Sequence, residues 1–209
     1  MTEERTRRGP YRSGIARRRQ IITTAAEVFA TYGYRNGSLR QIATAVGVTP
    51  AAVTRHFDGK EDLLTGVLQY WREQTDQLRD PDATGLDFFN GLRNLLRYHV
   101  DHPGYLELFL TLSTEATDPN HPAAEFIRKR YDDTVSDFGA QLTLAIDAGD
   151  ARPMSEGEID QQCRALIAYL DGIELQWLLN PTIDLAAQFG HHLDGVIASW
   201  RPVQSIAPR

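Results

Sequence analysis

The chain has 209 residues, of which 42% are hydrophobic and 24% are charged, a composition typical of a globular protein with its own core. No stretch approaches the roughly 18 consecutive apolar residues of a membrane span, and no signal-peptide core follows the basic first 20 residues, so we expect a cytoplasmic protein without a membrane partner. The net charge of −6 divides unevenly, because residues 1–60 hold 11 Lys and Arg against 4 Asp and Glu, whereas residues 61–209 hold 11 against 24; this asymmetry favours a polyanion bound at one end only.

The first 14 residues lack apolar periodicity and are predicted to form a disordered basic arm. Its arginines are Arg5, Arg7, Arg8 and Arg12. From Ile15 the apolar residues recur at spacings of three and four, which predicts a helix that ends at Gly33. The arm either lies along DNA or only aids solubility.

The next segment predicts two short helices joined by a tight turn. Ser38 and Gln41 fit a capping box that opens a helix ending at Gly47. Thr49 caps the following helix, with Pro50 at its first position, where the missing N–H costs nothing. Two short helices separated by three residues have the geometry of a helix-turn-helix, in which the second helix enters the major groove of DNA.

The remainder is predicted to be helical as well, beginning with a long helix that Asp58 and Glu61 cap and that extends to about Arg79. Further helices are expected over about 85–101, 103–116, 123–149, 155–179 and 183–200, and a frayed tail over 202–209. The predicted fold class is therefore all-α, with about nine helices. Its expected divisions are an arm (1–14), a DNA-binding domain (15–60), an effector-binding and dimerisation domain (61–201) and the tail.

Residues 21–64 resemble the DNA-binding domain of TetR-type transcription regulators. The matching positions are Ala25, Phe29, Gly33, Tyr34, Ser38, Ile42, Ala43, Gly47, Val48, Thr49, His56, Phe57, Lys60, Glu61 and Leu63. The family usually has tyrosine where this chain has Thr54, a shorter hydrogen-bond donor to a phosphate. Residues 115–122 and 171–177 resemble a common effector-domain type among these regulators, without indicating a ligand.

The resemblance implies which side chains contact DNA. The phosphate and base candidates are Arg17, Arg18, Ser38, Arg40, Thr49, Pro50, Ala51, Ala52, Thr54, Arg55, His56 and Lys60. Phosphate contacts set the register, and base contacts such as a bidentate Arg40–guanine pair carry the specificity. Structural alternatives stay open: Ser38 and Thr49 as helix caps only, Lys60 as a solvated lysine and His56 as a packed histidine.

The same resemblance implies an effector pocket among the middle helices and a dimer interface on the last two. The expected pocket residues are Phe89, Leu92, Leu96, His99, Phe109, Leu112, Tyr131, Phe138, Tyr169 and Trp177, with the histidine and the two tyrosines as polar anchors. The expected interface residues are Cys163, Leu185, Phe189, His192, Leu193 and Val196. Core packing is the competing explanation for most of the pocket residues.

No cofactor, metal site or enzymatic activity is expected. The histidines form no cluster with the ligand number of a zinc site, and Cys163 is the only cysteine. The sequence therefore predicts a homodimeric repressor whose binding to double-stranded, palindromic operator DNA is relieved by a small, largely apolar effector. The alternative is a DNA-binding dimer of the same fold that is regulated by protein partners.

Overall fold

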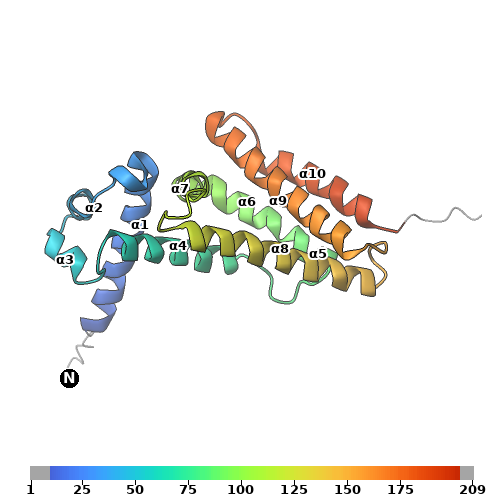
Figure 1. Cartoon of the computed structure of the whole chain (residues 1–209), viewed down its shortest axis with the longest axis horizontal. Coiled ribbons are helices and arrows are strands. Elements are labelled where there is room, and N and C mark those ends of the chain that lie inside the picture. The colour runs from blue at the N-terminus through green and yellow to red at the C-terminus, as the bar shows by residue number, and fades with distance from the viewer. Residues whose placement is uncertain (1–9, 203–209) are drawn as a thin grey trace, which may run out of the picture. The chain divides into compact units, whose positions relative to one another are not determined.

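The computed structural model describes residues 10–202 (Figure 1). Within that range every regular element is a helix, as predicted. The helices are α1 (Pro10–Asn36), α2 (Leu39–Val46), α3 (Pro50–Thr54), α4 (Lys60–Asp76), α5 (Leu86–Asn90), α6 (Leu92–Asp101), α7 (Pro103–Glu115), α8 (Ala124–Asp147), α9 (Glu156–Leu179) and α10 (Leu185–Trp200). Arg5, Arg7 and Arg8 of the expected arm, and most of the expected tail, lie outside the described residues.

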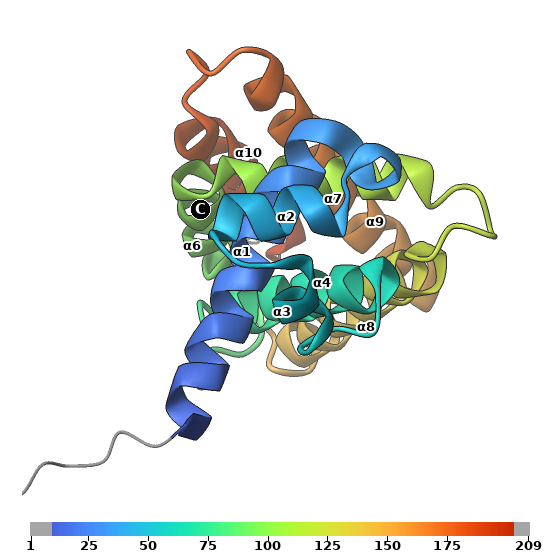
Figure 2. The same ribbon diagram turned by 90° about the vertical axis from the view of Figure 1, so that its left-hand side faces the viewer.

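The chain divides into two compact units, Met1–Arg72 and Glu73–Arg209. In the first unit α2 packs against α1, and α3 packs against α2 (Figure 2). Their inner faces are fully buried, with Phe29, Ile42, Val53 and Phe57 at the centre. This apolar centre fixes how the two short helices are presented to solvent.

The second unit is a layered helical bundle. In it α9 packs against both α8 and α10, and α10 also lies along α6 (Figure 1). Aromatic side chains form its centre: the Phe89 ring lies edge-to-face against Phe138, at 5.4 Å between centroids, and against Trp200, at 4.8 Å. Aromatic pairs in this arrangement add about 0.5–1.5 kcal/mol to the free energy gained by burying their surfaces.

Three expected boundaries and one expected cap differ in the structure. The helix expected to end at Gly33 has non-helical backbone angles there (φ 73°, ψ 158°), but α1 continues beyond this kink to Asn36. Residues 10–14, expected in the arm, are the first turn of α1, because Pro10 suits the start of a helix. The single helix expected over residues 85–101 is divided into α5 and α6 at Gly91, where the backbone hydrogen bonds span three residues. Asp58 and Glu61 do not form the expected cap; the Asp62 carboxylate instead accepts from the Asp58 N–H at 3.0 Å.

Candidate functional sites

The turn between α2 and α3 has the geometry that the sequence predicts. Ser38 Oγ accepts from the Gln41 N–H at 3.2 Å, while Gln41 Oε1 accepts from the Ser38 N–H at 2.8 Å, which completes the capping box. Gly47 ends α2 with a φ of 76° and a ψ of 36°, a left-handed conformation that favours glycine. Thr49 then accepts from the Ala52 N–H, with Pro50 at the first position of α3.

This arrangement leaves one exposed polar surface over α2 and α3. The exposed candidates are Arg40, Thr49, Pro50, Ala51, Thr54 and Arg55, with Ala52 and His56 half-buried. Small side chains alternate there with two arginines, so the backbone can approach a partner closely while the guanidinium groups can form paired hydrogen bonds with it. Such a surface suits the major groove of DNA, where arginine pairs with guanine.

Several phosphate candidates also have a structural role within the first unit. The hydroxyl oxygens of Ser38 and Thr49 are used in capping, and Thr54 Oγ1 donates to the Ala51 carbonyl at 3.2 Å. Capping is therefore confirmed for Ser38 and Thr49. Phosphate contact at all three stays a prediction.

Lys60 connects the start of α4 to the end of α1. Its Nζ donates to the Arg35 carbonyl at 3.0 Å and lies 4.4 Å from the centre of the Tyr34 ring. Burial, and then the Glu61 charge, raise the pKa of Tyr34. An ammonium near free carbonyls at a helix C-terminus is stabilising, so Lys60 is not simply a solvated lysine.

Three arginines of α1, Arg17, Arg18 and Arg19, contact side chains of the first unit. Arg18 lies 4.3 Å from the centre of the Phe57 ring, and Arg17 donates to Gln20 Oε1 at 2.7 Å. Arg19 donates to the Tyr70 hydroxyl at 3.0 Å. Arg18 therefore covers the core, whereas Arg17 is exposed and its predicted phosphate contact remains untested.

Most of the expected pocket residues are packed in the core of the second unit. Only Leu92 and Phe138 line an enclosed cavity, which has a volume of about 60 Å³ and also borders Thr75, Leu95 and Leu170. That volume is well below the roughly 300–1,000 Å³ of small-molecule sites. The others form no wall of this cavity: Phe89, Leu96, His99, Phe109, Leu112, Tyr131, Tyr169 and Trp177. For most of these apolar stripes, core packing is what the structure shows.

One polar pair lies inside this core and a second lies half-buried at its edge, and the sequence indicated only one partner of each. His99 Nδ1 is 2.6 Å from Glu174 Oε1, with both side chains at most 3% exposed. The Tyr131 hydroxyl donates to Asp171 Oδ2 at 2.7 Å. Asp171 and Glu174 were missed, although two carboxylates three residues apart interrupt the otherwise apolar stripe of α9.

Burial sets the chemistry of the second pair. The pKa of Asp171 is raised from 3.8 to about 6, chiefly by burial. The Tyr131 hydrogen bond opposes this rise, the Glu174 charge adds to it, and the Arg130 charge opposes it. Burial, followed by the Asp171 charge, raises the pKa of the Tyr131 hydroxyl above its usual range. Near neutral pH the tyrosine is therefore a donor, and the carboxylate is an anion that its surroundings stabilise poorly.

A wide groove of about 760 Å³ runs between α7, α8 and α9, with Tyr131 and Asp171 in its wall. The other residues that line it are Glu107, Leu110, Thr111, Ser113, Thr114, Thr117, Gly172, Leu175, Leu178 and Leu179. The groove is open to solvent along one side, and most of its lining is apolar. Its size fits a drug-sized ligand.

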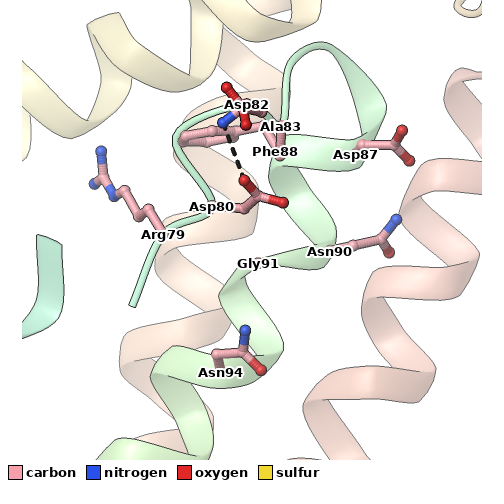
Figure 3. Close-up of a pocket in the computed structure, with 9 residues that line it drawn as sticks. All are labelled: Arg79, Asp80, Asp82, Ala83, Asp87, Phe88, Asn90, Gly91 and Asn94. Atoms are coloured by element: carbon pink, nitrogen blue, oxygen red, sulfur yellow. Dashed lines mark hydrogen bonds between the residues drawn. The ribbon is translucent and has the colours of Figure 1, made fainter. Parts of the chain in front are cut away.

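A third hollow, of about 440 Å³, lies beside the loop between α4 and α5. Figure 3 shows Asp80 and Asp82 on the loop beside Phe88 and the Asp87 carboxylate pointing away from that ring, with the Asp82 N–H donating to Asp80 at 3.0 Å. Among residues 10–202, no group of three or more His, Cys, Asp or Glu side chains is placed to hold a metal ion. In the same range, no helix is long and apolar enough to span a membrane.

The expected dimer stripe is wrong for four of its six residues. Cys163, Leu185, Phe189 and Leu193 are at most 1% exposed in the single chain. They pack on other helices of the same bundle, so they have no surface to offer a second copy. Burial also raises the pKa of the cysteine thiol to about 11.

The remaining two, His192 and Val196, are half-buried on α10. The His192 ring stacks on Tyr169 of α9 at 3.5 Å between centroids. Burial, and then the charge of His191, lower the pKa of His192. Tyr169 therefore belongs to the contact between α9 and α10 and not to a pocket.

Comparisons with known proteins agree with this geometry. The sequence model of bacterial regulatory proteins of the tetR family matches residues 21–67, which include α2, α3 and the turn between them. The HTH-type transcriptional regulator TtgR of Pseudomonas putida is 31% identical over 180 residues, covering 80% of this chain and 83% of TtgR.

Two further matches cover both units. The HTH-type transcriptional repressor Rv1474c of Mycobacterium tuberculosis is 31% identical over 179 residues, or 76% of this chain and 91% of the repressor. The solved complex of SmeT with triclosan is 20% identical, with a TM-score of 0.74 over 92% of this chain and 95% of SmeT. The likeness therefore extends well beyond the helix-turn-helix.

Proposed function

The chain belongs to the TetR family of bacterial regulatory proteins and is a DNA-binding transcriptional regulator, and we propose that it is a repressor which a small effector releases from its operator. The proposal places it in the cytoplasm, where its DNA target would be. The observation that carries it is the exposed surface of α2 and α3, where Arg40 and Arg55 stand among small side chains over a buried core. Phosphate contacts from the same helices would set the register of the complex.

The proposed operator complex contains two copies of the chain, because a five-residue recognition helix reads only a few base pairs. With the buried stripe excluded, the surface left for a partner is the outward face of α9 and α10. On α9 it carries Ala165, Ala168, Gly172, Leu175 and Leu179, and on α10 it carries Ala187, His191, Gly195 and Ala198. Small side chains let two helices approach closely, and Leu179 is 79% exposed in the single chain. Two-fold symmetry then implies a palindromic operator.

The proposed switch acts through α4. This helix begins directly after the helix-turn-helix, and the boundary between the two compact units falls within it. An effector bound to the second unit would change the spacing of the two recognition helices, which must lie about 34–36 Å apart on DNA. The effector can weaken DNA binding only as far as it prefers the DNA-incompetent state, and DNA must weaken effector binding by the same factor.

A regulator of the same fold without a small-molecule switch is the second candidate. The small enclosed cavity favours it, since about 60 Å³ leaves room for little more than two water molecules. The groove of about 760 Å³ favours the effector-responsive regulator. The solved SmeT complex shows that a protein of this fold holds triclosan, which supports the first candidate by analogy.

The test is a selection of random double-stranded DNA by the purified full chain. We expect an enriched palindrome with two half-sites about one helical turn apart, and loss of the enrichment at one base pair in each half-site for Arg40→Ala. The matched control is Arg72→Ala, which removes an exposed arginine of α4 outside the helix-turn-helix and should leave the palindrome unchanged. Enrichment of no sequence above the starting pool would contradict the proposal.

A further inference from the structure

The groove between α7, α8 and α9 differs from the enclosed cavity in charge. The residues that line it, all of them within the described part of the chain, include the carboxylates Glu107 and Asp171 but no lysine, arginine or histidine. The enclosed cavity is instead bordered by Arg79 and Arg130. The two hollows therefore suit ligands of opposite charge, and only the groove is large enough for a drug-sized molecule.

The groove is amphipathic along its length. Leucines from α7 and α9 form the apolar part of its lining, and hydroxyls from α7 and from the residue Thr117 after it form the polar part. The leucines are Leu110, Leu175, Leu178 and Leu179, and the hydroxyls are those of Thr111, Ser113, Thr114 and Thr117. An apolar body can bury against the leucines while a polar group reaches the wall that carries Tyr131 and Asp171.

Asp171 is the group in that wall whose charged form a ligand would stabilise most. It accepts a hydrogen bond from the Tyr131 hydroxyl, although a carboxylate has about four acceptor positions. Burial, together with the neighbouring Glu174 charge, raises its pKa to about 6 against the lowering effects of the Tyr131 hydrogen bond and the Arg130 charge, so the anion is poorly stabilised at neutral pH. A positive charge nearby would favour the anion again.

We propose that the effector is an apolar cation, an aromatic or aliphatic body with an amine or other basic group, which binds in the groove with its charge against the Asp171 carboxylate. The inference rests on the proposed function, since it names the chemical class of the effector. The apolar body lies on Leu110 and Leu178, and Tyr131 continues to donate to the other side of the carboxylate. Because Leu175 and Leu179 also belong to the outward face of α9, the ligand would lie at the edge of the proposed dimer interface.

The test uses three pyrene probes with the same apolar body: 1-pyrenemethylamine, which is cationic, 1-pyrenemethanol, which is neutral, and 1-pyrenecarboxylate, which is anionic. Fluorescence titrations of the full chain without DNA give each affinity. We expect the amine to bind at least about tenfold more tightly than the alcohol, and the carboxylate to bind most weakly. In Asp171→Asn, which keeps an acceptor for Tyr131, the amine should lose that advantage.

Two further variants separate ligand binding from folding. Asp147→Asn removes an exposed carboxylate of α8 that does not line the groove, so it should keep the preference for the amine. Tyr131→Phe removes the hydrogen bond that lowers the pKa of Asp171, so less of this carboxylate is ionised and the amine should bind less tightly than it does to the unaltered chain. Circular dichroism melting of each variant shows whether it is folded.

Three outcomes would overturn the inference: no measurable binding of the amine, equal affinity for the three probes, or a preference for the amine that survives in Asp171→Asn. A preference for the anionic probe would overturn it as well. None of these outcomes would affect the proposed function, which fails separately if the selection from random DNA enriches no sequence.

Discussion

Gly37, between α1 and α2, shows how a single residue maintains the DNA-binding unit. A Cβ built on Gly37 would lie 2.7 Å from Cδ1 of Phe29, a ring that is fully buried at the centre of that unit. The ring cannot move aside without disturbing the core. Here glycine is required by a close approach and not by an unusual backbone angle.

We therefore predict that Gly37→Ala lowers the free energy of unfolding by about 1–3 kcal/mol, the usual cost of overpacking a core. The matched control is Gly14→Ala in α1, where a Cβ would meet nothing within 4 Å and where alanine favours the helix. Urea denaturation followed by circular dichroism measures both. Equal stability of Gly37→Ala and the unaltered chain would show that Phe29 can adjust.

The raised pKa of Asp171 leads to a second prediction at the scale of residues, which concerns the pH dependence of the free energy of unfolding. Since its pKa is raised from 3.8 to about 6, the folded chain binds this proton more tightly than the unfolded chain does. Asp171 therefore carries no penalty below about pH 3.8; the penalty grows as the pH rises from 3.8 to about 6 and is constant above that. Its size, after allowance for partial exposure, is about 2 kcal/mol.

Asp171→Asn should consequently be more stable than the unaltered chain by about 2 kcal/mol at about pH 7.5, with a difference near zero at about pH 4. Denaturation at equal protein concentration across this pH range gives the difference directly. Asp147→Asn serves as the exposed control. A difference that is constant with pH would mean that Asp171 titrates normally.

At the scale of elements, the turn between α2 and α3 could be predicted from the sequence because it depends on local chemistry alone. Ser38, Gln41, Gly47 and Thr49 act on backbone groups within a few residues, so their pattern in the sequence determines the geometry. Which face of α10 is exposed could not be predicted in this way. The apolar stripe of Leu185, Phe189 and Leu193 makes α10 amphipathic, and the sequence pattern is the same whether helices of its own chain or a second copy cover that stripe.

The pairing of polar side chains in the second unit could not be predicted either, because it too depends on how helices far apart in the sequence pack together. His99 and Glu174 lie 75 positions apart, and Tyr131 and Asp171 lie 40 apart, so only the packing of α6, α8 and α9 brings each pair together. The sequence indicated the histidine and the tyrosine because they interrupt apolar stripes. Asp171 and Glu174 interrupt the stripe of α9 as well, but the partner that each of them meets depends on this packing and not on a local pattern.

The outward face of α9 leads to a prediction about assembly. Ala168 is exposed at its centre, so Ala168→Glu should place two like charges in a symmetric interface and yield a folded monomer. Ala140→Glu, at an exposed alanine of α8, should remain a dimer. Analytical ultracentrifugation at micromolar concentration distinguishes the two. A stable monomer before any substitution, or a dimer in Ala168→Glu, would contradict the assignment of this face.

At the scale of the whole molecule, charge is separated along the chain. Residues 1–60 are basic and residues 61–209 are acidic, so DNA should contact the basic N-terminal part of the chain. The two units are also compact on their own.

DNA binding through α2 and α3 is the central claim, and the salt dependence of that binding tests it most directly. Fluorescence anisotropy titrations of the selected operator over about 50–300 mM salt should give a log–log slope of about −0.9 for each phosphate neutralised. Arg40→Ala should reduce the ratio of operator to random-DNA affinity by about tenfold or more, whereas Lys60→Ala should weaken both equally and also destabilise the first unit. An affinity for duplex DNA that is independent of salt, or an unchanged ratio in Arg40→Ala, would contradict the central claim.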